Sequence, residues 1–467
     1  MTTTISRRLV LRGCALGSLG LVGGLGSVLT GCAPESGSTG RPGTVTYWSA
    51  LEGAPVRRYF AQEVVAKFAK AYPGEQIKVS YKNSHDLERE VRLALAANTA
   101  PDIVETNGPA FVPELAEQGY LADLSGYAKQ LGWNDTLLPW VPSLGTIDGK
   151  LYSIPIQFET LGIFYNQTLF DKLGYTLPEN RADLEALCSE LANQGITPFA
   201  AGNRDFAQTI EWFTSVFFSN YAGPQLMYDV LTGERPWTNQ VLVEAAALMQ
   251  DYFQRGWFGG GVERYFTTSF NKVHADLAAG KAAMNMEGTW FFAEVNNFFG
   301  KAGGNNNDWG FAPFPSLRDE VPYPLYPVGT GGTLSINADS ASPDAAAHVI
   351  DFLIGDRKKA AERIAAFPAE FALPLRFTAD DFPTSMDERI RTAYVDLMTA
   401  TGRGNIGYTN WTFSAPKAAV EIYEKAQDLV AGKLAPDAYM AGIEDAFQQD
   451  LERGFTPVVI DPQVNNG

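Results

Sequence analysis

Cysteine and histidine are scarce in this sequence, and their scarcity limits the chemistry that the chain can perform. Its 467 residues include three cysteines and three histidines. His85, His274 and His348 fall in unrelated helical patterns and show none of the spacings that hold a metal ion. We expect each histidine to be a surface or packing residue, and we expect no metal site and no cofactor.

The motifs of common enzymes are also missing. The chain has no GxSxG nucleophile elbow, no HExxH zinc motif, no CxxC pair and no phosphate-binding loop. A pair of carboxylates like that of a glycosidase stays open, because the sequence holds 53 aspartates and glutamates. We expect no catalytic residue.

Positive charge is the third shortage. Lysine and arginine together number 36, which leaves a formal net charge of -17 at pH 7. Such a surface repels phosphate backbones and anionic lipid head groups. The composition therefore argues against a nucleic-acid partner and suits a protein whose ligand is neutral or cationic.

The first 43 residues have the features of an export signal. Ser6–Leu11 contains a twin-arginine pattern, and Cys14–Thr30 is an apolar, glycine-rich run that leads to Cys32 in a context similar to the bacterial lipobox. We predict a twin-arginine lipoprotein signal peptide at 1–31, lipidation of Cys32 and a flexible tether at 32–43. An uncleaved anchor helix is the alternative. Both place the protein outside the cytoplasmic membrane and attached to it.

Cys188 is the cysteine that lies outside this region. It sits among leucines at helical spacing, which is typical of a buried small residue rather than a nucleophile. With Cys14 removed and Cys32 lipidated, no intramolecular disulfide can form.

The folded sequence begins with alternating strand and helix patterns. Because that order builds a parallel sheet covered by helices, ligands are expected beyond the carboxyl ends of its strands. The loops that matter are therefore Ser49–Gly53 and Glu105–Pro109. The predicted strands are Thr44–Trp48, Ile77–Tyr81 and Ala100–Val104, and the predicted helices are Val56–Phe68 and Leu87–Leu95.

The stretch Asp148–Leu169 predicts the junction of two lobes. Two strand patterns, Leu151–Ile156 and Leu161–Tyr165, are separated by a short polar segment. The first contains Pro155, which an interior strand tolerates poorly because proline cannot donate to the ladder. A chain that leaves one sheet and joins another explains this pattern and places Glu159 in the cleft.

The remainder of the chain is mostly helical. The glycine-rich stretch Gly329–Gly332 suggests a hinge or a close approach to ligand, and it offers the return crossing that two lobes need. Gly402–Phe413 is expected to be irregular. Helices are predicted within 183–193, 209–218, 241–253, 268–279, 390–398, 415–430 and 439–453 and from Trp290, with strands at 282–286 and 333–336.

Aromatic residues next to hydrogen-bonding residues recur at predicted loop and strand ends. Sugar rings present an apolar C–H face and a rim of hydroxyls, which aromatic faces and carboxylates or amides match. The aromatic content of 12% fits this interpretation, although any single aromatic residue is more often part of a core. The pairs are Trp48 with Glu52, Phe158 with Glu159, Phe206 with Asp205, Trp290 with Glu287, and Trp411 with Asn410.

With these residues in view, the chain resembles the extracytoplasmic solute-binding proteins of ABC importers, in the branch that includes maltodextrin-binding proteins. The likeness covers nearly the whole chain after the signal, and the order and spacing of its motifs match the family. The motifs are Asp148–Pro155, Phe164–Asn166, Pro101–Val104, Gly119–Leu121, Gly280–Met284, Gly288–Trp290 and Ser340–Ala346.

The resemblance implies an α/β fold of the type II periplasmic-binding-protein kind, with two three-layer α/β lobes joined by a hinge. The first lobe would comprise 44–157 and 333–385, and the second 158–332 and 386–467, with a third crossing near Asp380–Arg389. The ligand-binding residues would be Trp48, Glu52, Thr106, Asn107, Phe158, Glu159, Asp205, Phe206, Glu287, Trp290, Gly331, Asn410 and Trp411.

The implied function is capture of a saccharide, in particular a short oligosaccharide, and its delivery to the transmembrane subunits of an ABC permease by a monomer. Maltodextrin binders place a tryptophan where this chain has Thr106 and Asn107, which favours a different or shorter saccharide. The alternatives are a binder of another polar solute, such as a glycerophosphodiester or a polyol, and a lipid-anchored enzyme that acts on glycans.

Overall fold

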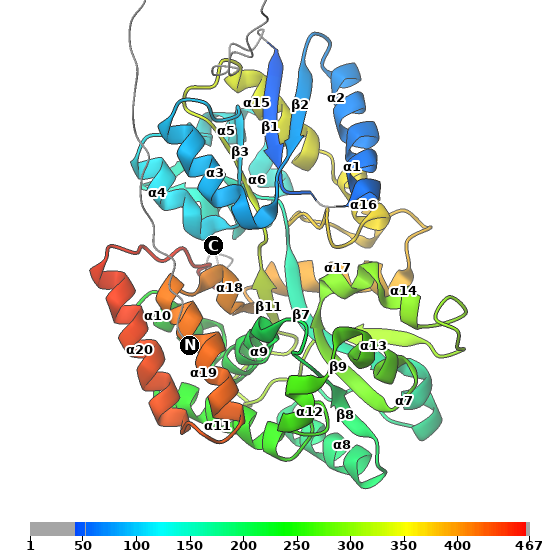
Figure 1. The fold of residues 1–467 in the computed structure, drawn as a ribbon. Coiled ribbons are helices and arrows are strands. Elements are labelled where there is room, and N and C mark those ends of the chain that lie inside the picture. Colours follow the sequence, from blue (N-terminus) through cyan, green and yellow to red (C-terminus); the bar gives the residue numbers. More distant parts are fainter. Residues whose placement is uncertain (1–42, 52, 464–467) are drawn as a thin grey trace, which may run out of the picture. The chain divides into compact units, whose positions relative to one another are not determined.

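The computed structural model describes residues 43–51 and 53–463, which form two main sheets and the helices around them (Figure 1). The predicted signal peptide, Cys32 and nearly all of the tether lie outside these residues, as does Glu52. Within the described ranges, no helix is long and apolar enough to cross a membrane.

The first sheet has the strand order β2-β1-β3-β12-β6. Its first three strands are parallel, as the alternating pattern predicted, whereas β12 runs antiparallel to both of its neighbours. Pro155 lies in β6, at the edge of the sheet, where a strand needs ladder bonds on one side only. The strands are β1 Thr44–Ser49, β2 Gln76–Tyr81, β3 Ile103–Thr106, β6 Ile154–Pro155 and β12 Thr333–Ile336.

Both faces of the first sheet are covered, because successive residues of a strand point to opposite sides. Ile103 belongs to the large core that contains Phe60 and Val64, whereas Val104 packs with Leu87 in a separate cluster. The surrounding helices are α1 Ala54–Tyr59, η1 Phe60–Val65, α2 Ala66–Ala71, α3 Ser84–Ala96, η2 Pro109–Phe111, α4 Val112–Glu117, α5 Ser125–Gln130, α6 Trp133–Thr136, η3 Val141–Gly145, α15 Pro343–Ile354, α16 Arg357–Ala366 and η6 Ala379–Asp381.

The second sheet has the order β13-β11-β7-β9-β8, with β10 also paired to β7. The prediction that Gly402–Phe413 is irregular was wrong. This segment contains β13, which pairs in parallel with β11, and a short helix, α18. A three-residue strand has too few residues to show a recognisable alternation, so β13 is defined by its hydrogen bonds to β11 and not by its own sequence. The strands are β7 Glu159–Asn166, β8 Thr197–Ala200, β9 Ala282–Gly288, β10 Trp309–Ala312, β11 Tyr326–Gly329 and β13 Ile406–Tyr408.

The helices predicted around the second sheet are found within a few residues of their expected positions, and several short helices between them were not predicted. The helix expected from Trp290 is instead a 3₁₀ turn, η5. The helices are α7 Gln167–Leu173, α8 Arg181–Asn193, η4 Ala207–Thr209, α9 Ile210–Ala222, α10 Pro224–Leu231, α11 Gln240–Gln254, α12 Val262–Thr267, α13 Phe270–Ala278, η5 Thr289–Ala293, α14 Val295–Phe298, α17 Glu388–Thr401, α18 Asn410–Phe413, α19 Pro416–Val430 and α20 Pro436–Glu452.

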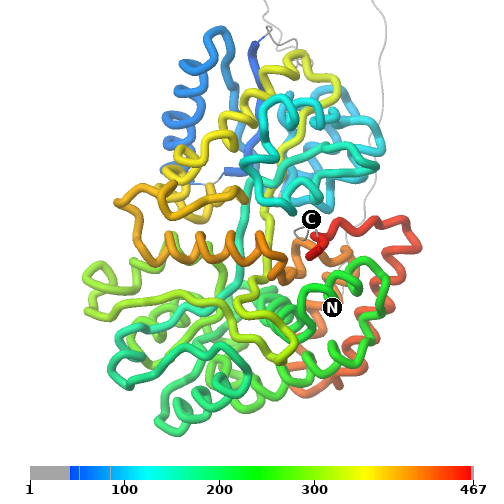
Figure 2. The backbone as a smooth tube through the Cα atoms, turned by 180° about the vertical axis from the view of Figure 1, so that it is seen from behind, coloured from blue at the N-terminus to red at the C-terminus, as the bar shows by residue number. Residues whose placement is uncertain are grey.

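Two neighbouring passages of the chain connect the sheets. One runs from β6 to β7 and the other from β11 to β12, and they lie side by side in both views (Figure 2). Their ends are paired, since Thr333 faces Pro155 in the first sheet and Gly329 faces Glu159 in the second. We call the two groups of elements the first and second lobe, and the boundaries given above stay a proposal.

The predicted strand Leu151–Ile156 is divided in the structure. Its beginning is β5, Lys150–Leu151, which forms a hairpin with β4, Thr146–Ile147. The turn residues Asp148 and Gly149 both have positive φ, as a two-residue hairpin turn requires. The end of the predicted strand is β6, which pairs with β12 instead. The two ends of the predicted strand therefore pair with different strands, β5 with β4 and β6 with β12.

Candidate functional site

A row of four aromatic rings lies in the second lobe. Trp212 of α9 packs against Trp290 of η5 with ring centroids 5.1 Å apart, and Trp290 is 6.2 Å from Trp411 of α18. Phe270 of α13 extends the row, with its ring nearly parallel to that of Trp212 at 6.0 Å. All four side chains keep part of their surface exposed. This aromatic row brings together two predicted residues from distant segments, Trp290 and Trp411.

Because Gly288 has no side chain, the ring of Trp290 can pack directly against the backbone of Gly288. A Cβ atom at this position would approach the indole ring to 2.2 Å, closer than any real contact. Since φ of Gly288 is -86°, its role is to make room rather than to supply an unusual backbone conformation. The motif Gly288–Trp290 therefore sets the position of one ring in the row.

Glu159 is joined directly to the aromatic row. Its Oε1 accepts a hydrogen bond of 3.0 Å from Trp411 Nε1. The residue as a whole keeps some exposure, but protein atoms surround its carboxyl, and this removal from water raises the pKa to about 7. Gly329 lies against the pair, because a Cβ atom there would come within 2.9 Å of Glu159 Cγ. The Trp411 N–H acts in the opposite direction by favouring the ionised carboxylate.

Three predicted site residues of this half are embedded in the fold. Glu287 accepts hydrogen bonds from Asn285 and pairs with His274 at 2.8 Å. The Asn410 amide is buried and donates to Thr214 Oγ1 at 2.6 Å. Phe158 is 1% exposed. Their contact with ligand stays a prediction. In the structure, these three side chains pack and form hydrogen bonds within the second lobe.

Asp205 and Phe206 lie on the surface of the second lobe. Asp205 accepts from Arg204 Nε at 2.9 Å and from the backbone N–H of Phe270 at 2.9 Å. These two bonds, the backbone one first, hold the pKa of its carboxyl below the usual range. The Phe206 ring is 45% exposed. Asp205 thus secures the start of α13, which carries the last ring of the row.

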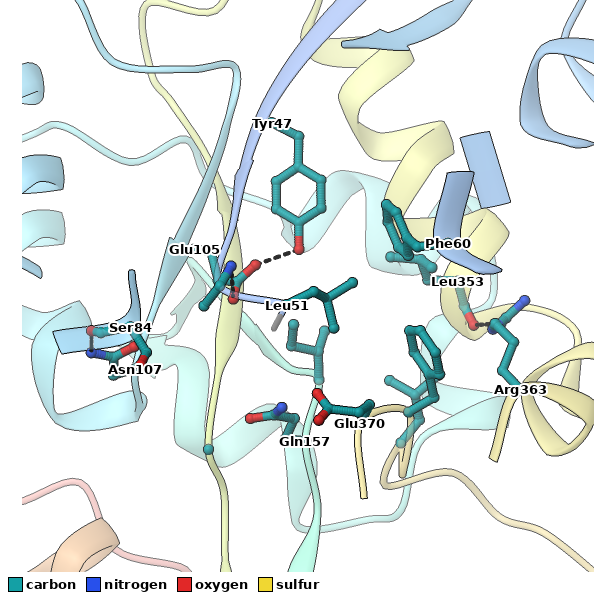
Figure 3. A pocket seen from close by; sticks show the side chains of 15 residues that line it. Tyr47, Leu51, Phe60, Ser84, Glu105, Asn107, Gln157, Leu353, Arg363 and Glu370 are labelled. Atoms are coloured by element: carbon teal, nitrogen blue, oxygen red, sulfur yellow. Dashed lines mark hydrogen bonds between the residues drawn. The ribbon is translucent and has the colours of Figure 1, made fainter. Parts of the chain in front are cut away.

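The first lobe contributes a pocket of about 250 Å³ beside the two passages (Figure 3). Asn107, Gln157 and Gly331 line the part next to the two passages, which we call its entrance, and Ser84, Glu105 and Glu370 add further polar side chains to the lining. Asn107 Nδ2 donates to the carbonyl of Ser84 at 2.8 Å, which fixes the amide. A Cβ atom on Gly331 would come within 2.4 Å of Gln157 Oε1. Gly331 is therefore needed for this close approach, as the glycine-rich stretch suggested.

Glu105 is a buried carboxyl in the wall of the pocket. It accepts a hydrogen bond from the Tyr47 hydroxyl and one of 3.1 Å from the backbone N–H of Ala50. Burial nevertheless raises its pKa to about 7. Sequence reasoning placed the Glu105–Pro109 loop at the site but gave this glutamate no role, because nothing in the pattern distinguishes a buried carboxyl from an exposed one.

Two further predicted residues of the first lobe have partners. Thr106 is fully buried, and its Oγ1 lies 2.6 Å from Thr333 Oγ1, which links β3 to β12. The Trp48 ring lies beneath the ammonium group of Lys82, which is 3.8 Å from the ring centroid. Any ligand that stacks on Trp48 must use the other face or displace Lys82.

The histidines and Cys188 occupy packing positions where their side chains are described. His274 stacks on Phe291 at 4.0 Å, and His348 contacts Glu75 at 3.0 Å. Among the described residues, no group of three histidine, cysteine or acidic side chains is placed to hold a metal ion. Cys188 is buried in α8, and burial raises the pKa of its thiol.

Two α/β lobes joined by paired crossing strands define the class of hinged two-lobed binding proteins. The comparison with family models agrees: residues 53–360 match the model of the bacterial extracellular solute-binding proteins. The chain belongs to this family, which consists of binding proteins rather than enzymes, and the resemblance inferred from its motifs is confirmed.

Individual relatives extend this result. The chain is similar to the melibiose/raffinose/stachyose-binding protein MelE of Bacillus subtilis, with 28% identity over 44% of this chain and 47% of the relative. It is also similar to the alpha-glucosides-binding periplasmic protein AglE of Rhizobium meliloti, with 24% identity over 54% of this chain and 58% of the relative. The chain thus spans about half the length of the curated relatives it matches.

Solved structures show the same fold. The sugar-binding protein MalE from Xanthomonas citri superposes with a TM-score of 0.69, covering 88% of this chain and 98% of that one at 20% identity. The type II periplasmic-binding-protein architecture is confirmed.

Proposed function

We propose that this protein is a lipid-anchored, extracytoplasmic solute-binding protein that captures a short saccharide and delivers it to an ABC importer. The observation that carries the proposal is the aromatic row of the second lobe together with Glu159. Partly exposed indole faces suit the C–H face of a sugar ring, and a carboxylate beside them accepts from its hydroxyls. Two relatives, MelE and AglE, are named for binding oligosaccharides or glucosides, which supports the same ligand class.

The mechanism requires binding without chemistry. Each lobe offers part of the site: the aromatic row lies in the second lobe, Asn107 in the first, and Gln157 and Gly331 in the two passages between them. A ligand that contacts both parts stabilises the closed arrangement by its extra affinity for it, which shifts the population of the two states. The importer then distinguishes the loaded protein by its closed arrangement. The passages between β6 and β7 and between β11 and β12 are the hinge.

Location follows from the N-terminal sequence and the family. The twin-arginine pattern, the apolar run and Cys32 predict export and lipidation, and the family is extracellular by its description. We propose that a monomer is tethered on the outer side of the cytoplasmic membrane. Mass spectrometry of the membrane fraction tests this, since a Cys32→Ala variant should lose the lipid mass and appear in the soluble fraction.

The ligand itself is tested with the purified chain from residue 33. Mono-, di- and trisaccharides are screened by thermal shift, and hits are measured by calorimetry together with product analysis. Stabilisation without product supports the proposal. Stabilisation by glycerophosphodiesters or polyols alone would replace the saccharide with another polar solute, and product formation would overturn the binding function.

The second candidate, a phosphate-bearing ligand, has less support. Such a ligand needs unpaired arginine or lysine side chains near the site. Arg204 is paired with Asp205 at 2.9 Å, and Lys82 is paired with Glu90 at 2.7 Å. Arg363, which also lines the first-lobe pocket, is 3% exposed and donates to the carbonyl of Leu353. Acids and amides prevail among the polar side chains at the entrance of the first-lobe pocket.

A further inference from the structure

Beyond its polar entrance, the first-lobe pocket has a part lined by apolar side chains. Its inner walls are the side chains of Leu51, Phe60, Leu353, Phe371 and Leu373. Four of these are at least nine-tenths buried, and the rings of Phe60 and Phe371 lie 6.4 Å apart and nearly parallel. In Figure 3, Leu51 stands between the entrance residue Gln157 and the ring of Phe60. We call this inner part the apolar pocket.

The apolar pocket is continuous with the proposed saccharide site. Asn107, Gln157 and Gly331, at its entrance, belong to the loop after β3 and to the two passages between the lobes. A ligand held there by its hydroxyls would have the apolar pocket directly beside it. Because all lining residues come from the first lobe and the passages, the pocket exists independently of lobe closure.

A bare sugar ring does not fit the inner walls chemically. Every hydroxyl that enters an apolar region without a hydrogen-bond partner loses its hydrogen bonds to water, and this loss disfavours binding. The carboxyl of Glu105 is already engaged by Tyr47 and Ala50, and the second carboxyl of the lining, that of Glu370, lies beside Gln157 at the entrance in Figure 3. An apolar group meets no such cost and gains from each area it buries.

The volume identifies the size of that group. An apolar cavity of roughly 150 Å³ lined by leucine, isoleucine and phenylalanine stays dry and accepts benzene. The whole pocket here measures about 250 Å³, so it has room for a six-membered aromatic ring together with the polar atoms at its entrance.

One donor marks the far end of the pocket. Arg363 lies on the side opposite Asn107 in Figure 3, is 3% exposed, and donates to the carbonyl of Leu353. Its Nε has no hydrogen-bond partner in the described part of the chain. An acceptor atom at the tip of an apolar group would satisfy this N–H.

From this geometry we infer that the ligand is a glycoside whose aromatic aglycone occupies the apolar pocket, with an oxygen acceptor at its far end. The inference rests on the proposed saccharide binding and specifies its substrate class. The sugar part binds the entrance residues and the aromatic row, and the aglycone supplies specificity by burying its ring among Leu51, Phe60 and Phe371.

The test compares matched glycosides on the soluble chain. Methyl, phenyl and 4-nitrophenyl glycosides of glucose, galactose, xylose and maltose, in both anomers, are titrated by calorimetry. For the sugar that binds, we expect the phenyl glycoside to bind at least tenfold more tightly than the methyl glycoside. The 4-nitrophenyl glycoside, which carries acceptor oxygens, should bind more tightly still.

Two variants locate the aglycone. Leu51→Trp, in the loop after β1, and Leu353→Phe, in α15, each fill the apolar pocket, so the aromatic gain, which is the affinity ratio of phenyl to methyl glycoside, should fall to less than threefold. Melting temperatures near that of the parent chain establish that each variant is folded, and either folded variant suffices for the test. Leu93→Trp, at an exposed leucine of α3, is the matched control and should retain the gain.

The outcomes separate this inference from the proposed function. Equal affinity for methyl and phenyl glycosides overturns the inference and leaves saccharide binding intact. An aromatic gain that persists in a folded filling variant also overturns it, because the aglycone then binds elsewhere. If no glycoside and no free saccharide binds, the proposed function fails and the inference fails with it.

Discussion

The two lobes contribute opposite kinds of surface to the proposed site. The second lobe offers flat, partly exposed rings in the aromatic row, whereas the first offers amide and carboxyl groups around the entrance of an apolar pocket. Flat aromatic rings can stack on many different sugars, since every pyranose has an apolar face. A pocket of defined shape with fixed polar groups at its entrance can bind only a few ligands. The comparison suggests that affinity comes mainly from the second lobe and selectivity from the first.

The largest expected effect is a pH dependence of stability that arises from one buried carboxyl group in each half of the proposed site. Glu105 and Glu159 both have a pKa raised to about 7 by removal from water. Between pH 4.5 and 7 the folded protein keeps protons that the unfolded chain has lost, so the free energy of unfolding should fall as pH rises and level off above pH 7. Each group contributes on the order of 1–3 kcal/mol.

Denaturant unfolding at pH 5, 6, 7 and 8 checks this dependence. Glu159→Gln and Glu105→Gln should each flatten the curve to a similar extent, because burial raises the pKa of both carboxyls to about 7. Asp319→Asn, at an exposed acid of the second lobe, serves as control. A parent curve that rises between pH 5 and 7 would refute the assignment of raised pKa values.

The affinity of the two halves is compared next. Trp290→Ala and Trp411→Ala should each weaken saccharide binding by about 1–3 kcal/mol, since each removes a large ring face. Asn107→Ala in the first lobe should cost about 0.5–1.5 kcal/mol, the usual contribution of one hydrogen bond. Calorimetry measures all three, with Tyr423→Ala on α19 as an aromatic control outside the row. Equal losses in both lobes would contradict the proposed division of roles.

The glycine beneath Trp290 gives a subtler test of the second lobe. Gly288→Ala keeps all four aromatic side chains of the row but forces the Trp290 indole away from the backbone at position 288. We expect a loss of roughly 1–3 kcal/mol in stability or in saccharide affinity. The control is Gly126→Ala in α5, where an added Cβ atom meets nothing within 4 Å. Unchanged melting and unchanged saccharide affinity in the first variant would show that Trp290 is free to move.

The smallest effect concerns Trp48 in the first lobe. Lys82→Met removes the cation above its ring and should lower the free energy of unfolding by about 0.5–1 kcal/mol. The control is Lys78→Met, at an exposed lysine of β2. If saccharide affinity rises in Lys82→Met, the covered face of Trp48 is the one that the ligand uses, and the first lobe also contributes a stacking surface.

Local chemistry made much of the fold predictable. The four-residue spacing of Val56, Phe60, Val64 and Phe68 predicted a helix that buries all four, and the structure shows this across α1, η1 and α2. Pro155 predicted a strand that cannot lie inside a sheet, and β6 is an edge strand. These features depend on a proline ring or a periodic apolar face, which act over a few residues.

The candidate site was predictable only in part. The loops after β1 and β3 follow from the parallel order, and Trp290 and Trp411 were selected because polar residues flank them. Trp212 was missed, because α9 is apolar on nearly every side and nothing in its sequence distinguishes the ring that stays partly exposed. Phe158 and Asn410 also belong to pairs of an aromatic and a polar residue, as Trp411 does, yet packing buries both of them.

The sequence alone specified the two-lobed class, the order of its elements and the residue types suited to a sugar, because periodicity, proline and glycine act locally. Which carboxyl is removed from water, which ring keeps a free face and how deep the first-lobe pocket extends depend on contacts between segments far apart in the chain. Glu159 and Trp411 are 252 positions apart and share one hydrogen bond. No local pattern encodes such a pair, since it arises only when β11 pairs with both β7 and β13 and so brings α18, which follows β13, near Glu159.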